Sequence, residues 1–192
     1  MRRQHLVVMV KYPQAGRVKT RLGAGIGRVQ AAWWFRHQVR GLLQRLEDPR
    51  WQIWLSVAPD TEIESKVWPL HLPRISQGQG DLGQRMKGAF EALPDGPACL
   101  IGGDIPGVTR REVAQAFRAL GSRDAVFGPA TDGGFWLTGF KRVKPLPRGL
   151  FKPVRWSSQQ TLADSIATLG GQRHALVATL DDVDTKADLA KG

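Results

Sequence analysis

Cysteine is almost absent from this sequence. Cys99 is the only one in 192 residues, so the chain can form neither an internal disulfide nor a cysteine-based metal cluster. The sequence also lacks an apolar run of about 18 residues, the length that a membrane-spanning helix needs. The short apolar run 6–10 follows a basic start and superficially mimics a signal peptide, but Lys11 interrupts it and no small-residue cleavage site follows. We therefore interpret it as a buried strand and expect a cytoplasmic protein.

Acidic residues are scarce relative to basic ones. The chain has 28 Lys and Arg against 17 Asp and Glu, a net charge of +11, and residues 1–50 alone contribute +9. Such a segment suits nucleic acid, an anionic membrane surface or a phosphorylated small molecule. Because no known nucleic-acid-binding motif and no pairing of basic with exposed aromatic positions is present, we expect a localised phosphate-binding loop and no nucleic-acid partner.

Apolar and helical stretches alternate along the chain, as in α/β proteins. We expect strands over residues 6–10, 52–58, 98–101, 124–128, 134–140 and 175–180, and helices over about 20 residues after position 27 and over 81–93, 109–120, 157–169 and 184–190. Glycines at 23–27 are expected to loosen the chain, and Ser157 to cap the fourth helix. With no internal repeat or linker, residues 1–192 are expected to form one domain. The predicted fold is a mostly parallel sheet wrapped by helices, with ligands beyond the carboxyl ends of its strands.

Cations and glycines are interspersed in the loop after the first strand, KYPQAGRVKTRLGAGIG. Lys11, Lys19 and Arg21 can neutralise an anion, and Gly16 lets the backbone approach it. The spacing is not that of the G-x-x-x-x-G-K-[ST] phosphate loop, and GAGIG is not G-x-G-x-x-G, which argues against a dinucleotide dehydrogenase. A solvated basic loop is the alternative. We favour phosphate binding because the loop follows the first strand.

Asp104 follows an apolar strand in IGGDIPG. This position is at the ligand edge of the sheet, where a hard divalent cation takes carboxylate oxygens and phosphate completes its coordination shell. A cap for the helix after Thr109, five residues too early, and an ion pair with an arginine are the alternatives. We favour a metal ligand.

Three further acidic motifs are ambiguous from their residues alone. Asp81 in GQGDLGQRM occupies a typical helix N-cap position. Asp132 in PATDGG fits a hairpin turn as well as a site at the sheet edge. The acids of LDDVDT crowd together, and an exposed acidic turn with Asp184 or Thr185 as the N-cap is the simpler interpretation.

In their order along the chain these motifs are more specific than any one of them. KYPQAGRVKTRL, GQGDLGQRM, IGGDIPGV, GPATDGGFWLTGF and LDDVDTKADL together resemble the glycosyltransferase A-like family found beside radical-SAM/selenodomain proteins, within the nucleotide-diphospho-sugar transferase superfamily. The resemblance covers residues 11–189. It implies a Rossmann-like α/β/α sandwich with a mixed sheet that carries one reversed strand.

Two relatives of that family sharpen the implied site. Phospholactate guanylyltransferases carry a similar lysine loop and a similar Asp-Gly-Gly turn. Molybdenum-cofactor guanylyltransferases carry a Gly-x-Asp-x-Pro metal site, matched here at Asp104, and a C-terminal motif similar to residues 182–189. The similarity of the C-terminal motif implies Asp184, or with less support Asp182, as another metal ligand. The usual Gly-Gly-x-Gly-x-Arg nucleotide loop is missing, so the base that the site takes stays open.

The resemblance implies a Mg²⁺- or Mn²⁺-dependent transferase with a nucleotide or nucleotide-sugar donor and a small-molecule acceptor. Glycosyl transfer is favoured over nucleotidyl transfer because the family is labelled so, and a non-enzymatic binder of nucleic acid or anionic surfaces is the competing class. Lys19, Arg21, Asp104 and Asp132 are the implied catalytic groups. The implied site comprises, for the nucleotide and its phosphates, Lys11, Gly16, Lys19, Arg21, Asp81 and Arg85; for the metal, Asp104 and Asp184; and on the acceptor side, Asp132, Gly133 and Gly134.

Overall fold

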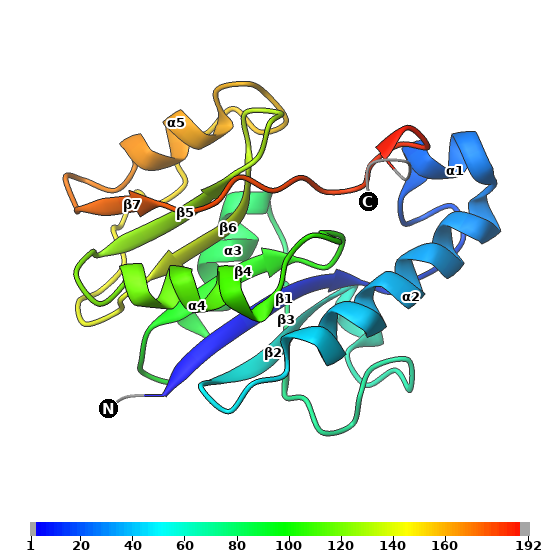
Figure 1. Cartoon of the computed structure of the whole chain (residues 1–192), viewed down its shortest axis with the longest axis horizontal. Coiled ribbons are helices and arrows are strands. Elements are labelled where there is room, and N and C mark those ends of the chain that lie inside the picture. The colour runs from blue at the N-terminus through cyan, green and yellow to red at the C-terminus, as the bar shows by residue number, and fades with distance from the viewer. Residues whose placement is uncertain (1–2, 189–192) are drawn as a thin grey trace.

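The computed structural model describes residues 3–188, and its strands form one sheet in the order β3-β2-β1-β4-β6-β5-β7 (Figure 1). The strand β6 runs antiparallel to β4 and β5, and the other neighbours are parallel. This confirms the predicted mixed, mostly parallel sheet with one reversed strand. The strands are β1 (Gln4–Lys11), β2 (Trp51–Ala58), β3 (Arg74–Ser76), β4 (Ala98–Gly102), β5 (Ala125–Pro129), β6 (Phe135–Phe140) and β7 (His174–Leu176). The helices are α1 (Thr20–Ile26), α2 (Arg28–Leu46), α3 (Leu82–Glu91), α4 (Arg110–Ala119) and α5 (Thr161–Ala167), with a 3-10 turn, η1, at Asp60–Glu62.

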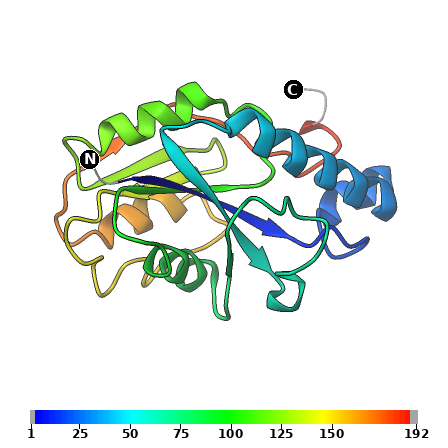
Figure 2. The ribbon, with the colours of Figure 1, turned by 90° about the horizontal axis from the view of Figure 1, so that it is seen from below.

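Helices cover both faces of this sheet (Figure 2). Successive side chains of a strand point to opposite faces, and β1 uses this alternation to supply both layers of the core. Leu6, Val8 and Val10 pack in the cluster that contains the α2 and α4 side chains, whereas Val7 packs in the cluster that contains those of α3. Strands buried on both faces read as nearly continuous apolar runs, which is why β1, β4 and β5 are recognisable in the sequence.

Two predicted helix starts are confirmed by their hydrogen bonds. The Asp81 carboxylate accepts from Gln84 N at 2.8 Å, and the Gln84 side chain accepts from Asp81 N at 2.9 Å. Thr109 and Glu112 form the equivalent capping box at the start of α4. Each box satisfies backbone N–H groups that have no partner within the helix.

The glycine-rich segment after the basic loop is helical, so the prediction that it loosens the chain was wrong. A Cβ on Gly23 would lie 3.4 Å from the Arg28 Cα, which means that the missing side chain lets α1 pack closely against α2. The break between the two helices is confined to Gly27, whose φ of +99° suits glycine. Tertiary packing has outweighed the low helix propensity of glycine.

The C-terminal third also differs from prediction in its boundaries. Ser157 caps no helix: its φ is +55°, and α5 begins at Thr161, the residue after Gln160. The strand β7 ends at Leu176, earlier than the predicted 180. Residues 185–188 form a turn, and the end of the predicted helix 184–190 lies outside the described residues. The short strand β3 and the turn η1 were not predicted. Among the described helices, none is both long and apolar enough to cross a membrane.

Candidate functional site

A cavity of about 610 Å³ opens where β1 and β4 end. The chain leaves β1 toward β2 and later returns on the other side of β1 to form β4, and such a reversal leaves a crevice at the carboxyl ends of the strands. Charged side chains of both signs line it: Lys11, Arg17, Lys19, Arg21, Arg85, Asp104, Asp132, Asp182 and Asp184. The cavity is therefore suited to a ligand that carries several negative charges together with a cation.

The Lys19 ammonium lies among three aspartate carboxylates in this cavity. Its Nζ atom lies 2.5 Å from Asp104 Oδ2, 3.0 Å from Asp184 Oδ1 and 3.6 Å from Asp182 Oδ2. Only 6% of the Lys19 side chain is exposed. The structure thus brings together three of the residues that the resemblance implied, Lys19, Asp104 and Asp184, and adds Asp182, the choice that had less support.

These residues meet because the C-terminal segment crosses the end of the sheet to reach α1 (Figure 1). Val183 N donates to Asp104 O at 3.2 Å, and the buried Val183 side chain packs with Leu22 and Ala31. Asp182 and Asp184 flank Val183, so its burial fixes both carboxylates beside Lys19. At the other strand, a Cβ on Gly102 would lie 2.7 Å from Asp104 Oδ1, which explains the glycine before this carboxylate.

Burial and charge shift the pKa values of this cluster. Burial by itself lowers the pKa of Lys19, but the combined attraction of Asp104, Asp182 and Asp184 raises that pKa above its ordinary value. Burial, followed by repulsion from Asp104 and Asp184, raises the pKa of Asp182 to about 6 although Lys19 opposes the change. Lys19 therefore stays charged at neutral pH, and Asp182 is harder to ionise than an exposed carboxyl group.

The backbone of Lys19 is unusual as well. It adopts a left-handed conformation with φ 45° and ψ 50° at the start of α1. A non-glycine residue in this region typically costs on the order of 1–3 kcal/mol and is found most often at functional sites. The conformation turns the Lys19 side chain into the acidic cluster at the point where the loop becomes a helix.

The donor set fits a divalent cation in its chemistry. Mg²⁺ and Mn²⁺ take hard carboxylate oxygens, and Asp104, Asp182 and Asp184 approach one point from two separate segments. In this structure the Lys19 ammonium occupies that point, and the side chains of the described residues are not arranged as a ready-made metal site. A cation held by these carboxylates thus requires Lys19 to move.

In the predicted phosphate-binding loop, Arg21 and Lys11 line the cavity but Gly16 does not. Arg21 NH1 donates to Asp184 Oδ2 at 3.0 Å while 74% of its side chain is exposed. Lys11 lines the cavity at the end of β1. Gly16, with φ +77°, is not a lining residue, and a Cβ there would meet the Arg28 side chain at 3.6 Å. The loop therefore presents cations to the cavity but does not wrap it with this glycine.

Arg85 and Asp81, both predicted to bind the nucleotide, differ in their positions relative to the cavity. Arg85 lines the cavity, and its Nε donates to Gly80 O at 3.1 Å. Asp81 caps α3 and is not a lining residue, which supports the capping interpretation. The sequence analysis missed Gln77, which lines the cavity although it is only 5% exposed. Its Nε2 donates to Val10 O at 3.0 Å and to Ser56 O at 2.9 Å, and no motif marked it.

The Asp-Gly-Gly turn lies beside the C-terminal acidic segment, because Thr131 donates from its backbone N and from its hydroxyl to Asp181 Oδ1 at 2.8 and 2.9 Å. Asp132 and Gly134 line the cavity, and Asp132 Oδ1 accepts from Gly134 N at 2.8 Å. Gly133 does not line it and instead packs against the next loop, where a Cβ would lie 2.3 Å from the Gln159 Cα. The turn is thus both an ordinary Asx-type turn and a wall of the cavity.

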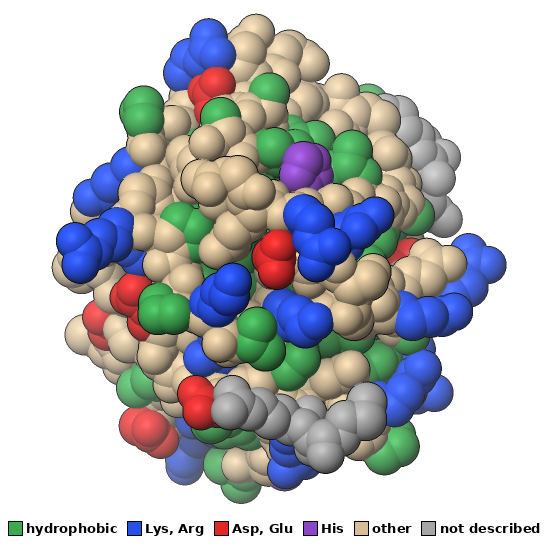
Figure 3. Space-filling model, turned by 90° about the vertical axis from the view of Figure 1, so that its left-hand side faces the viewer, with side chains coloured by type: hydrophobic (Ala, Val, Ile, Leu, Met, Phe, Trp, Pro, Cys, Tyr) green, Lys and Arg blue, Asp and Glu red, His purple; other side chains and the backbone are tan. Residues whose placement is uncertain are grey.

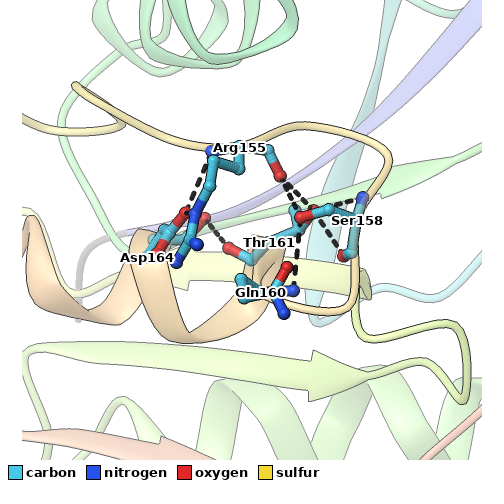
Figure 4. A network of polar contacts seen from close by, with 6 residues as sticks. Arg155, Ser158, Gln160, Thr161 and Asp164 are labelled. Atoms are coloured by element: carbon cyan, nitrogen blue, oxygen red, sulfur yellow. Dashed lines mark hydrogen bonds and ion pairs between the residues drawn. The ribbon is translucent and has the colours of Figure 1, made fainter.

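A loop that the sequence analysis did not single out completes this wall with Trp156, Ser157 and Thr161. Its hydrogen bonds are shown in Figure 4. Thr161 Oγ1 lies 2.8 Å from Arg155 O and 2.9 Å from Ser158 O. The Arg155 guanidinium holds both oxygens of Asp164 at 2.9 and 2.8 Å. This network fixes the loop against α5.

Comparisons with known proteins agree with the architecture. A family model described as "Uncharacterized protein conserved in bacteria (DUF2064)" matches residues 42–158. A protein of Desulfovibrio desulfuricans G20, described as a "putative nucleotide-diphospho-sugar transferase", is 31% identical with a TM-score of 0.83, over 96% of this chain and 84% of that chain. No curated protein sequence matches the chain.

Two more distant structures share the fold. CMP:2-keto-3-deoxy-manno-octonic acid synthetase, complexed with CTP, is 15% identical with a TM-score of 0.53, over 99% of this chain and 96% of that chain. Rv0371c from Mycobacterium tuberculosis H37Rv, complexed with manganese, is 14% identical with a TM-score of 0.57, over 99% and 97%. The fold is that of the nucleotide-diphospho-sugar transferases, as the resemblance implied.

Proposed function

This chain belongs to the family described as "Uncharacterized protein conserved in bacteria (DUF2064)", and on that premise we propose that it is a Mg²⁺- or Mn²⁺-dependent transferase with a nucleotide donor. The observation that carries the proposal is the convergence of Lys19, Asp104 and Asp184 at the end of β1 and β4. The similar protein of Desulfovibrio desulfuricans G20, with its description as a nucleotide-diphospho-sugar transferase, supports it. So do the CTP and the manganese held by two proteins of the same fold.

In this proposal the cations of the cavity hold the donor phosphates. Lys19, released from the carboxylates, pairs with phosphate oxygens together with Lys11 and Arg21. Asp104 and Asp184 hold the divalent cation, with Asp182 beside them, and that cation, when bound, supplies further neutralisation of phosphate charge. Fixed positive charge at these positions stabilises the negative charge that develops on the leaving group.

In this proposal Asp132 acts on the acceptor. Its carboxylate lines the same cavity as the acidic cluster and is oriented by the hydrogen bond from Gly134 N. A carboxylate in this position can accept the proton of an attacking hydroxyl, a contribution worth roughly 10²- to 10⁴-fold in rate. This arrangement supports glycosyl transfer from a nucleotide sugar to a small hydroxyl-bearing acceptor, with release of the nucleoside diphosphate.

One observation favours nucleotidyl transfer as the second candidate. Arg17, Lys11 and Arg85 line the cavity in addition to Lys19 and Arg21, which gives both a triphosphate and a phosphorylated acceptor cations to contact. Nucleotidyl transfer to such an acceptor releases pyrophosphate. The two candidates thus differ in the product that leaves the site.

Product analysis tests both candidates. The protein is incubated with Mn²⁺ and each of a panel of nucleotide sugars and nucleoside triphosphates, together with a mixture of small hydroxyl and phosphate acceptors. The released nucleotides and pyrophosphate are then separated by ion-exchange chromatography. Glycosyl transfer predicts nucleoside diphosphate, and nucleotidyl transfer predicts pyrophosphate. Asp104→Asn is the control that should abolish release. If the wild type releases neither product faster than Asp104→Asn does, the catalytic proposal is wrong.

A further inference from the structure

We infer that Lys19 closes the unliganded site to free divalent cations, so that the ligand this site accepts is a complex of the cation with a polyphosphate. The inference rests on the proposed function, because it concerns the same cavity. It goes further by naming the form in which the donor and the metal enter.

The first step is the position of the ammonium. Lys19 Nζ lies between the Oδ atoms of Asp104 and Asp184 at 2.5 and 3.0 Å. A divalent cation bound to the same oxygens would lie about 2.0–2.6 Å from each. The ammonium and the cation would therefore occupy the same volume, and both are positively charged. They cannot be held by these carboxylates at the same time.

The second step is the cost of moving Lys19 without a new partner. Its side chain is 6% exposed, and an ion left buried without its counter-ions is strongly destabilising. A free cation must bear this cost when it displaces the ammonium. A polyphosphate in the cavity removes the cost, because its oxygens give the displaced ammonium new anionic partners.

The third step separates Lys19 from its neighbour Arg21, which also contacts Asp184. The Arg21 side chain is 74% exposed and can turn into solvent at little cost, since exposed ion pairs contribute little. Lys19 is therefore the residue that excludes the free cation. Because linkage is reciprocal, the polyphosphate must raise the affinity for the cation by the same factor by which the cation raises the affinity for the polyphosphate.

The test measures Mn²⁺ binding by the electron paramagnetic resonance signal of the free ion, with and without inorganic tripolyphosphate, which presents the phosphates without a base. Association of Mn²⁺ with tripolyphosphate in buffer is measured separately and subtracted. For the wild type we expect weak binding of Mn²⁺ alone and an affinity roughly 5- to 150-fold higher with tripolyphosphate, the usual range for coupled sites. Equal affinities in the two conditions would overturn the inference.

Variants assign the effect to Lys19. Lys19→Met is expected to bind Mn²⁺ alone at least about tenfold more tightly than the wild type and to lose the coupling to tripolyphosphate. Lys19→Arg keeps a cation among the carboxylates and should still bind Mn²⁺ alone weakly. Lys11→Met removes one positive charge from the same cavity but not from the acidic cluster. Because Lys11 is exposed and its charge is screened, the affinity of this variant for Mn²⁺ alone should stay within about twofold of the wild type.

Two results would contradict the inference. One is an affinity of Lys19→Met for Mn²⁺ alone equal to that of the wild type; the other is an equal increase in Lys19→Met and Lys11→Met, which would reveal a general charge effect. Either result leaves the proposed function intact if the wild type still binds a nucleotide with Mn²⁺. If no nucleotide binds under any condition, the proposed function itself fails. Should Lys19→Met not fold, equal affinities of the wild type with and without tripolyphosphate would still overturn the inference.

Discussion

Lys19 combines an unfavourable backbone with a favourable side-chain position. Lys19 adopts a left-handed conformation as the N-cap residue of α1, and its ammonium is held by Asp104, Asp182 and Asp184. The ion pairs hold the residue in a conformation that the backbone alone disfavours. The sequence predicted the charge of Lys19 and its place after the first strand. It did not predict the contact with the C-terminal acids, because that contact depends on where Val183 packs.

Gly133 illustrates a residue whose type is set by its neighbour. Its φ is +87°, and a Cβ would overlap the backbone of Gln159. Gly171 has nearly the same φ, +83°, but nothing lies within 4 Å of its Cβ position, so Gly171→Ala isolates the backbone effect, which we expect to cost about 1–2 kcal/mol. Gly133→Ala should cost a further ~1–3 kcal/mol for the overlap. Urea denaturation of both variants measures the difference, and equal losses of stability would show that the contact with Gln159 does not matter.

We predict a pH dependence of stability that comes from His5 and does not involve the residues of the candidate site. Trp54 Nε1 donates to His5 Nδ1 at 3.1 Å, so Nδ1 is unprotonated in the folded chain. Burial, with smaller contributions from Arg142 and Arg3, lowers the pKa of His5 below 6.5 in spite of the Asp95 carbonyl. Below pH 6.5 the unfolded chain then binds a proton that the folded chain does not, and stability falls as the pH falls, by up to about 1.4 kcal/mol per unit.

The measurement is the free energy of unfolding at pH 7 and pH 5 for the wild type and His5→Gln, whose side-chain oxygen can still accept from Trp54. We expect the wild type to lose more stability than the variant over this range. Parallel pH profiles would mean that His5 titrates alike in the folded and unfolded chain.

Among the elements, the strands other than β3, the helix α2 and the two capped helices were predictable, whereas β3, α1 and the start of α5 were not. Local signals suffice for β1 and β4, which are apolar runs buried on both faces, and for the capping boxes of α3 and α4. The helix α1 forms against the propensity of its glycines because it packs on α2. The loop before α5 is held by contacts of Thr161 and Arg155 that no spacing in the sequence reveals.

The hydroxyl of Thr161 is the main support of that loop. It contacts the carbonyls of Arg155 and Ser158 and accepts from Ser158 N at 3.2 Å. Thr161→Val keeps the shape of the buried side chain but removes these bonds, and we expect it to lower stability by about 1–3 kcal/mol. Hydrogen exchange should rise in residues 155–161.

The matched control is Arg155→Ala. It removes the exposed ion pair with Asp164, whose pKa the Arg155 hydrogen bonds lower to about 2, and such pairs contribute little to stability. A larger loss for Arg155→Ala than for Thr161→Val would show that the ion pair, and not the hydroxyl, supports the loop.

For the whole molecule, the excess of positive charge raises the question of a polyanionic partner. Five of its cations line the cavity, among four aspartates. On the side of the molecule turned away from α1, the described Lys and Arg side chains that are visible alternate with acidic and apolar ones (Figure 3). This distribution fits a concentrated phosphate site better than a continuous track for nucleic acid. The net charge was readable from the sequence, but the arrangement of five cations and four aspartates around one cavity required the fold.

The salt dependence of binding distinguishes a nucleotide site from a track for nucleic acid. Binding to a polyanion track falls steeply with salt, by roughly 10³- to 10⁵-fold between 50 and 200 mM for six to ten phosphate contacts. The proposed site contacts one nucleotide and a cation in a partly enclosed cavity, so we expect nucleotide affinity to fall less than about tenfold over this range. Fluorescence anisotropy of a labelled nucleotide and of a labelled oligonucleotide measures both slopes. Tight oligonucleotide binding with the steep slope would favour the competing class.

The central claim is that nucleotide binding depends on a cation held at Asp104. Its most direct test is the melting temperature of the wild type and of Asp104→Asn, measured with a panel of nucleoside triphosphates and nucleotide sugars, with and without Mn²⁺. A nucleotide present at 100 times its dissociation constant stabilises a protein by about 2.7 kcal/mol. We predict that at least one nucleotide raises the wild-type melting temperature in Mn²⁺, and that the increase disappears with EDTA and in Asp104→Asn. An increase that Asp104→Asn retains in full, or the absence of any increase across the panel, would contradict this account.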